Sequence, residues 1–299
     1  MEKIVYIDQS KKSYTKSQFI RYFEAKVLYT IRKYDMIDKN DEIVAAISGG
    51  KDSVAMSHIL NKIISKRGQQ LKTLLIDEGI PGYRDSTITD AIKFCKDESI
   101  ALTIISSKKE FKFGLTDALK KLKMNPCTIC GTMRRYLLNK YARKLGATKI
   151  ATGHNMDDEA QTILMNQYKG NANLSAKLGP VTGVKEHKKF IRRIKPLYFM
   201  SEKEVTIYST LKAFPVKYTE CPNSRDTFRS QVRDQLNLLE NSFSGTKNGI
   251  INSFLDVLPI LKTKEHSKIV ECLKCHEPSA RQTCSMCELL EKYSKSLHQ

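Results

Sequence analysis

Apolar residues in the first half of the chain fall into short runs that alternate with longer amphipathic segments. Each run is typical of a strand buried on both faces, and the runs cover residues 43–47, 71–76, 101–105 and 149–152. Helices are predicted between and after them, at 51–65, at 84–98, after Cys130 and from Met156 onward. Strands that alternate with helices predict an α/β fold with a doubly wound parallel sheet.

The chain ahead of the first predicted strand forms an arm. Within it, Phe19, Phe23, Val27 and Ile31 recur every four residues, which predicts one helix with an apolar stripe. Beyond the sheet, further helices are expected at 201–212 and 225–240. We therefore expect four units: an N-terminal helical arm (1–41), a catalytic domain (42–240), a helical linker (241–265) and a cysteine-rich module (266–299).

The bulk composition is that of a globular protein. The chain has 299 residues, of which 40% are hydrophobic and 28% charged, and this excludes a disordered chain. No apolar run approaches the roughly 18 residues that span a bilayer. The N-terminus lacks the apolar core of a signal peptide, so the sequence predicts a cytoplasmic protein.

The formal net charge is +19. A surplus of this size favours a polyanionic partner, because each phosphate that a cation neutralises releases counterions. The charge is also segregated: residues 106–149 contain twelve Lys or Arg but only two acids, and residues 185–195 form a second basic stretch. A lysine-rich surface that merely faces solvent is the alternative, but segregation favours a binding face.

A hexapeptide loop joins the first predicted strand to the next helix and comprises Ser48, Gly49, Gly50, Lys51, Asp52 and Ser53. Its glycines allow a tight turn, and amides at a helix N-terminus attract an anion. Lys51 adds positive charge, and Asp52 could hold Mg²⁺. A Walker A loop is excluded, since Ala45 stands where its first glycine belongs and Asp52 replaces its Ser or Thr. An ordinary strand-to-helix turn is the alternative.

A second polar segment, residues 151–159, follows the fourth predicted strand. In a doubly wound sheet the first and fourth strands lie side by side where the strand order reverses, and ligands bind there. We therefore expect Gly153, His154 and Asp158 to face the hexapeptide loop across one crevice, where His154 and Asp158 could contact nucleotide or metal. The acidic run 157–159 by itself is more often a first helical turn favoured by the helix dipole.

Seven of the eight cysteines fall into two groups. The first group is Cys127 and Cys130, a C-x-x-C pair expected just before a helix, with Cys221 in a later loop. Three thiolates suit a metal site with an open coordination position. A persulfide-carrying redox pair or three unrelated cysteines fit the spacing equally well. Cations on the following helix, such as Arg134 and Arg135, are expected to lower the thiol pKa values.

The second group is formed by the C-terminal cysteines. Cys272-x-x-Cys275 and Cys284-x-x-Cys287 are two knuckles separated by eight residues, which is a strong signal for tetrahedral zinc. Disulfides are disfavoured in the cytosol. We expect a structural zinc ribbon that grips RNA or a partner. The eighth cysteine, Cys95, is expected to be a small core residue.

Several segments carry a further likeness when they are taken together. They are residues 48–53, 127–139, 151–161, 195–197, 201–204 and 220–222, followed by the terminal four cysteines. This combination resembles the tRNA 2-thiouridine synthases of archaea and eukaryotes and their bacterial T-loop relatives, which are PP-loop ATP pyrophosphatases. The resemblance runs from about residue 19 to the C-terminus and looks closest to the archaeal branch.

The resemblance implies that ATP adenylates O2 of a tRNA uridine, that pyrophosphate leaves, and that sulfur then displaces AMP. It implies a 4Fe-4S cluster on Cys127, Cys130 and Cys221, with the sulfur on its open iron. Asp52 and Asp158 would hold magnesium, and Arg134 would neutralise phosphate charge. These six residues are the expected catalytic set. The expected ATP site comprises residues 48–53, Gly153, His154, Asp158, and the backbone near Ala46 and Ile76.

The partners implied by the resemblance are tRNA, sulfide or a ubiquitin-like thiocarboxylate as sulfur donor, and a second copy of the chain in a homodimer. The wobble uridine is the preferred target, with the T loop as the alternative. One feature departs from the family pattern. Relatives usually carry a second zinc module ahead of the PP-loop, but the first 57 residues here contain no Cys or His. Thr15 and Gln18 stand where ligands are expected.

Two other functions fit parts of the sequence. A lysidine-type tRNA ligase or an amidotransferase-type synthetase would use the same nucleotide loop with an amine, but would need no thiolate cluster. A non-enzymatic zinc-ribbon RNA-binding protein with a decayed loop would bind RNA without converting ATP to AMP.

Overall fold

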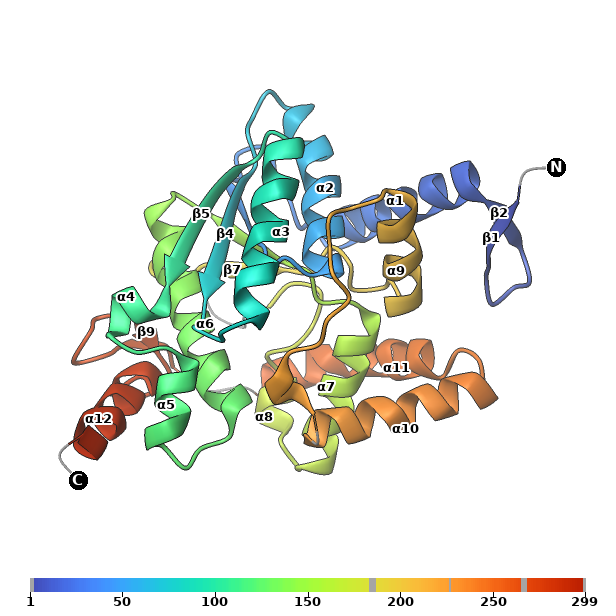
Figure 1. The fold of residues 1–299 in the computed structure, drawn as a ribbon. Helices are drawn as coiled ribbons and strands as arrows, with labels where there is room; N and C mark the ends of the chain where they lie inside the picture. Colours follow the sequence, from blue (N-terminus) through green and yellow to red (C-terminus); the bar gives the residue numbers. More distant parts are fainter. Residues whose placement is uncertain (1–2, 183–186, 226, 265–267, 298–299) are drawn as a thin grey trace.

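A five-stranded parallel sheet organises the molecule, with the strand order β5-β4-β3-β6-β7 (Figure 1). The computed structural model describes residues 3–182, 187–225, 227–264 and 268–297. The strands are β3 (Ile43–Ala46), β4 (Lys72–Asp77), β5 (Ala101–Ser106), β6 (Lys149–Thr152) and β7 (Arg192–Ile194). The predicted α/β fold with a doubly wound parallel sheet is confirmed, and β7 is an edge strand that the apolar pattern did not indicate.

Helices cover both faces of the sheet. One core contains α1 (Lys16–Lys33), α2 (Lys51–Ser65), α3 (Tyr83–Asp97) and α9 (Glu202–Leu211). The predicted stripe of α1 lies in this core, because Phe19, Phe23 and Val27 are fully buried, and Cys95 is a buried core residue as expected. The opposite face is covered by α6 (Pro126–Lys144), whose Leu137 packs in one cluster with strands β3 and β6.

Two helical groups lie beyond the carboxyl edge of the sheet (Figure 1). The first consists of α7 (Met156–Tyr168), α8 (Ala172–Ser175), α10 (Phe228–Ser242) and α11 (Thr246–Thr263), and the second of α4 (Ser107–Phe111), α5 (Leu115–Lys121) and α12 (Ser285–Leu297). The expected linker contains α11, which packs against α7 and α10. The expected boundary at 265–266, and Lys185 of the second basic stretch, lie outside the described residues. No described helix is both long and apolar enough to cross a bilayer.

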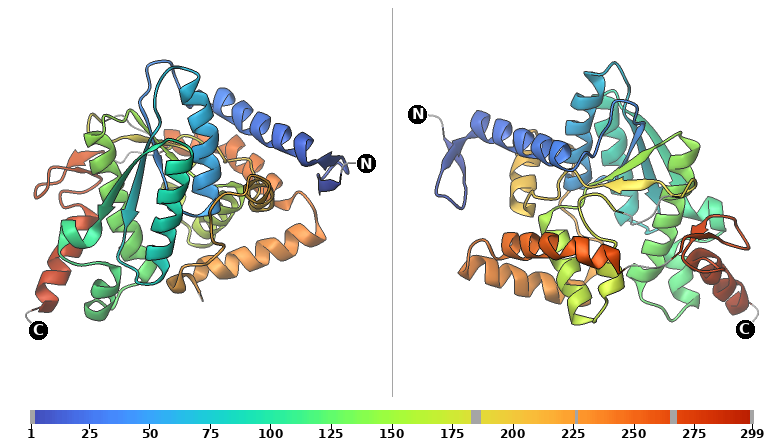
Figure 2. Two further views of the ribbon diagram at one scale, coloured as in Figure 1. Left: turned by 45° about the horizontal axis from the view of Figure 1, so that its top comes forward. Right: turned by 180° about the vertical axis from the view of Figure 1, so that it is seen from behind.

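A hairpin of β1 (Ile4–Ile7) and β2 (Ser13–Thr15) precedes α1 and projects from the body of the molecule (Figure 2). Aromatic side chains hold it. The ring centroids of Tyr6 and Phe19 are 5.0 Å apart, and those of Tyr14 and Tyr22 are 4.9 Å apart. The hydroxyl of Tyr22 donates to the buried carboxylate of Glu204 at 2.7 Å. An aromatic cluster thus anchors the arm without any Cys or His.

Thr15 and Gln18, which occupy the positions expected for zinc ligands, instead begin α1. The side-chain oxygen of Gln18 accepts the amide hydrogen of Thr15 at 2.9 Å. This contact satisfies a backbone donor that a helix N-terminus would otherwise leave free. The two residues therefore have a local structural role in this chain.

Candidate active site

The hexapeptide loop leads from β3 into the first turn of α2. Gly49 has a φ of +83°, and a Cβ built on it would lie 2.0 Å from the carbonyl oxygen of Thr87, so no other residue fits. The hydroxyl of Ser53 accepts from the Ser48 amide at 3.0 Å and donates to the Gly50 carbonyl at 2.9 Å. No side chain caps α2. Its first amides are thus available to an anion.

The residues that follow β6 lie against this loop, because β3 and β6 are neighbours in the sheet. Gly153 lies so close to α2 that a Cβ on it would be 2.8 Å from the Ser53 amide nitrogen. Asn155 joins the two segments. Its side-chain Nδ2 donates to Asp52 Oδ1 at 2.9 Å, and its backbone amide donates to Asp158 Oδ2 at 3.2 Å. The structure therefore brings the two loops together. Asn155 bridges them, a role that was not predicted from the sequence.

Two carboxylates, those of Asp52 and Asp158, meet at this junction. Burial, together with the negative charge of Asp52, raises the pKa of Asp158 to about 7. The Nζ of Lys51 lies 3.2 Å from Asp52 Oδ2 and 2.9 Å from Glu202 Oε1, so its charge is shared between two acids. Two acids this close together suit a divalent cation that prefers oxygen ligands, such as Mg²⁺.

His154 follows β6, and its Nδ1 is 3.0 Å from Thr152 Oγ1. The residue is exposed, but the protein around the ring removes part of its water. This desolvation, followed by the positive charges of Lys195 and Arg193, lowers the pKa of His154 to about 3. The imidazole is therefore neutral near physiological pH.

Ala46 and Ile76, the residues expected beside adenine, lie in the adjacent strands β3 and β4. Ala46 is half-buried and Ile76 is buried. The Ile76 carbonyl accepts from Nε of Arg84 at 3.2 Å, and Nη1 of the same arginine donates to the Ser48 carbonyl at 2.9 Å. Arg84 therefore ties the hexapeptide loop to the end of β4.

Cys127 and Cys130 lie in the first turn of α6. The expectation that they precede a helix is wrong, because α6 begins at Pro126. Proline is favoured at the first helical position, and the side chain of Asn125 caps the helix by accepting from the Cys127 amide at 3.0 Å. The helix thus starts one turn earlier than expected and holds both thiols on a rigid element.

Cys221 comes to the same place from a distant loop. It precedes the 3₁₀ turn η1 (Pro222–Ser224), which packs against α6, and the Asn223 carbonyl is 3.9 Å from Cys127 Sγ. Cys130 and Cys221 belong to one apolar cluster. The expected lowering of the thiol pKa is wrong for Cys130, because burial raises its pKa despite the nearby charge of Arg134.

Arg134 connects this cysteine site to the nucleotide loop. Its Nη2 lies 3.0 Å from Cys130 Sγ, and its Nε lies 3.1 Å from Oε1 of Glu78. Glu78 is only 3% exposed and also accepts from Nε of Arg84 at 2.8 Å. A continuous chain of charge-assisted contacts thus runs from Ser48 through Arg84, Glu78 and Arg134 to Cys130. Glu78 was not predicted as a site residue from the sequence, although an acid directly after a buried strand lies at the carboxyl edge of the sheet, where ligands bind.

The C-terminal cysteines form a compact group in which all four sulfur atoms lie within 4.8 Å of one another. The Sγ–Sγ distance is 3.8 Å for Cys272 and Cys287 and 3.6 Å for Cys275 and Cys284. A tetrahedron with sulfur about 2.3 Å from its centre has edges of about 3.8 Å. The four thiols therefore fit a tetrahedral metal ion. Among the residues that the structure describes, no other three Cys, His, Asp or Glu are this close.

The C-terminal module packs on α6, the helix that carries the first cysteine pair (Figure 2). Its hairpin consists of β8 (Val270–Glu271) and β9 (Pro278–Ser279). Glu277, in the loop between these strands, accepts a hydrogen bond from Arg143 at 3.0 Å. The ring of Tyr293 in α12 stacks on Phe113 with centroids 3.9 Å apart. The two cysteine sites are thus held in a fixed relation by one helix.

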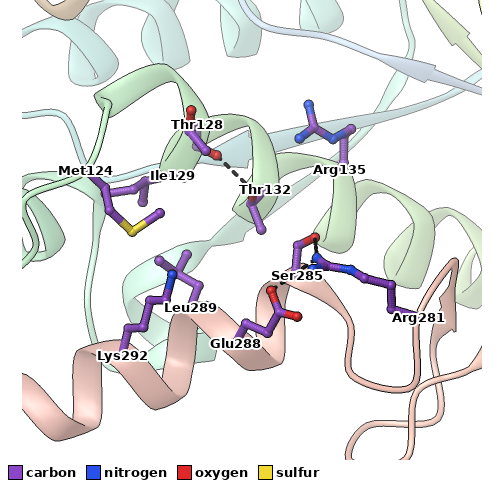
Figure 3. Close-up of a pocket in the computed structure, with 10 residues that line it drawn as sticks. All are labelled: Met124, Thr128, Ile129, Thr132, Arg135, Arg281, Ser285, Glu288, Leu289 and Lys292. Carbon is purple, nitrogen blue, oxygen red and sulfur yellow. Dashed lines mark hydrogen bonds and ion pairs between the residues drawn. The ribbon is translucent and has the colours of Figure 1, made fainter. Parts of the chain in front are cut away.

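A cavity of about 300 Å³ remains between α6 and α12 (Figure 3). Its apolar lining comes from Met124, Ile129 and Leu289, while Thr128 and Lys292 contribute polar groups. The lining also includes Arg135 and the ion-paired Arg281 and Glu288, so the cavity is polar on one side.

Comparisons with known proteins show similarity over most of the chain. A family model described as a PP-loop domain matches residues 21–239. The chain is 34% identical over 288 residues to the tRNA-5-methyluridine(54) 2-sulfurtransferase of Pyrococcus horikoshii, covering 96% of this chain and 90% of the relative. It is 33% identical to the tRNA 2-thiolation protein NcsA of Haloferax volcanii, covering 90% and 89%. The solved U34-tRNA thiolase NcsA from Methanococcus maripaludis, described with its 4Fe-4S cluster, superimposes with a TM-score of 0.82 at 31% identity, covering 96% and 93%.

Proposed function

Because this chain belongs to the PP-loop family that contains the tRNA 2-thiolation proteins, we propose that it is a tRNA-uridine 2-sulfurtransferase. In this reaction the uridine O2 attacks the α-phosphorus of ATP, pyrophosphate leaves, and a sulfur nucleophile then displaces AMP to give 2-thiouridine. The chain of contacts from Ser48 through Glu78 to Cys130 carries the proposal. It joins the hexapeptide loop to the thiol site through direct contacts.

The nucleotide half of the crevice would bind the ATP phosphates at the first amides of α2, beside Lys51. Asp52 and Asp158, both held by Asn155, would bind Mg²⁺, whose charge favours departure of pyrophosphate. Arg134 would stabilise the negative charge that develops on the α-phosphate. His154 would offer a neutral hydrogen-bonding group, since its low pKa keeps it uncharged.

The thiol half would hold a 4Fe-4S cluster on Cys127, Cys130 and Cys221. Cys127 and Cys130 at the start of α6 and Cys221 beside η1 offer three thiols, one fewer than a cluster held entirely by cysteine uses. When bound, such a cluster supplies a coordination position that can carry sulfide. Arg134 would orient Cys130 through the contact to its sulfur, and the buried side chains of Ile129 and Met133 would exclude water.

We take the wobble uridine as the target, because the solved relative is named a U34-tRNA thiolase, whereas the Pyrococcus relative is named for position 54. Sulfide or a ubiquitin-like thiocarboxylate would be the sulfur donor. The C-terminal cysteines would hold zinc as a structural ion, and the chain would act as a homodimer. Mapping the modified nucleotide to the anticodon loop or the T loop separates the two targets.

ATP turnover that depends on tRNA tests the proposal. With ATP labelled at the α-phosphate, the protein should release labelled AMP only when tRNA, Mg²⁺ and sulfide are present. Release of AMP with an amine in place of sulfide would instead support a lysidine-type or amidotransferase-type enzyme. Complete absence of AMP would leave a non-enzymatic RNA-binding protein.

A further inference from the structure

Two arginines face each other across the gap between α6 and the edge strand β7. The side-chain oxygen of Asn139 in α6 accepts the amide hydrogen of Ile191 at 3.0 Å, which sets the register of helix and strand. Arg193 follows Ile191 by two residues in the strand. Arg135 precedes Asn139 by four residues, about one turn, in the helix. Two strand residues advance about 6.6 Å and four helical residues about 6 Å, so the two side chains end at the same level.

The side chain of Arg193 lies on the face of the sheet that α6 covers. It is paired in register with Ile150 of β6, and side chains of paired residues in a parallel sheet lie on the same face. Ile150, Ile191 and Leu138 of α6 belong to one buried apolar cluster. Arg193, two residues beyond Ile191, must therefore face α6 as well. Arg135 lines the cavity between α6 and α12, and its guanidinium extends away from α12 (Figure 3).

These two cations lack a counter-charge. Among the residues that the structure describes, no carboxylate pairs with Arg135 or Arg193, and the Nε of Arg193 is buried without a hydrogen-bond partner. Desolvation and the charges of Arg135 and Arg134 lower the pKa of Arg193 to about 10. The one acid near Arg134, Glu78, is already shared with Arg84. Arg193 is partly buried, and a buried Nε without a partner is costly unless a ligand completes its hydrogen bond.

We propose that Arg135 and Arg193 form a binding site for a phosphodiester of the RNA substrate, a role that rests on the proposed tRNA thiolation. The paired guanidinium groups match the oxygens of a phosphate. The ATP phosphates have their own site at the amides of α2 and Lys51. The cavity beside Arg135, with Ile129, Thr128 and Lys292 in its lining, offers room for an adjoining nucleotide. The site would hold the backbone while the target uridine enters the crevice.

Charge-removing substitutions test this site. Arg193→Met and Arg135→Met should each weaken binding of an unmodified tRNA transcript about tenfold or more, since a charge-assisted contact is lost. Each should also reduce the slope of log affinity against log salt by about 0.7–0.9. Arg67→Met is the matched control, because Arg67 is exposed beyond the far end of α2, about 22 Å along that helix from the nucleotide loop.

Two further measurements separate a binding role from the alternatives. Affinity for ATP should be unchanged in Arg193→Met, and a loss of ATP affinity with normal RNA affinity would assign the arginine to the nucleotide instead. The melting temperature of Arg193→Met should equal or exceed that of the parent, because a partly buried charge with an unsatisfied Nε has been removed. A marked fall in melting temperature would show a structural role and overturn the inference.

Binding of tRNA by the unsubstituted protein distinguishes a failure of the phosphodiester site from a failure of the proposed function. If the unsubstituted protein binds the tRNA transcript and both variants bind it equally well, the phosphodiester site is refuted while tRNA thiolation stands. If the unsubstituted protein does not bind tRNA at all, the proposed function itself fails.

Discussion

Replacement of Glu78 by glutamine should separate the nucleotide loop from the cysteine site. The carboxylate is 3% exposed and pairs with Arg84, itself 5% exposed, at 2.8 Å, and with Arg134 at 3.1 Å. Removal of one partner of a buried ion pair costs about 3–5 kcal/mol of unfolding free energy, because the other charge stays buried. Arg84 keeps its hydrogen bonds to the Ile76 and Ser48 carbonyls, so we expect about 3 kcal/mol.

The assay is denaturant unfolding of Glu78→Gln, compared with the parent and with Glu110→Gln. Glu110 also pairs with a cation, Lys140 at 2.9 Å, but both side chains are partly exposed, so this control should lose less than about 1 kcal/mol. In addition, thiolation by Glu78→Gln should fall more than ATP affinity, since Arg134 is no longer held on Cys130. Equal unfolding midpoints for Glu78→Gln and Glu110→Gln would refute the network.

Three further outcomes follow from the site. Asp52→Ala should abolish release of AMP and pyrophosphate while the circular dichroism spectrum is unchanged, and normal turnover would show that the hexapeptide loop does not bind ATP. Asp158 has a pKa raised to about 7 and binds a cation only when ionised, so Mg²⁺–ATP affinity measured by calorimetry should rise as the pH passes upward through about 7. Asp158→Asn should remove that rise. Cys272→Ser should release zinc, measured by elemental analysis, without loss of iron, and stoichiometric zinc in this variant would exclude Cys272 as a ligand.

The elements of the sheet could be predicted from the sequence because their patterns are local. The run at 149–152 coincides with β6 and the segment 51–65 with α2, since a buried parallel strand and an amphipathic helix each leave a periodic signature. The meeting of the two loops also followed from topology, because the first and fourth predicted strands are adjacent in any sheet of this order.

The contacts that complete the site could not be predicted, because they join residues far apart in the chain. Glu78 and Arg134 meet only when α6 crosses the end of β4, and β7 is a short polar edge strand with little apolar signal. The direction of the Cys130 pKa depended on burial, which outweighs nearby charge and is invisible in a motif. The hairpin before α1 is likewise held by aromatic contacts with no local pattern.

Formation of 2-thiouridine by the purified protein is the most direct test of the account. The anaerobically purified chain would be incubated with a tRNA transcript, Mg²⁺–ATP and sulfide, and the nucleosides analysed by mass spectrometry. We expect 2-thiouridine from the parent protein, and none from Cys127→Ser, Cys130→Ser or Cys221→Ser, each of which should also lose the brown chromophore while still binding ATP. Full-rate thiolation by metal-free, air-exposed protein would contradict the cluster and favour a persulfide. AMP release without any thiolated nucleoside from the parent would contradict tRNA thiolation itself.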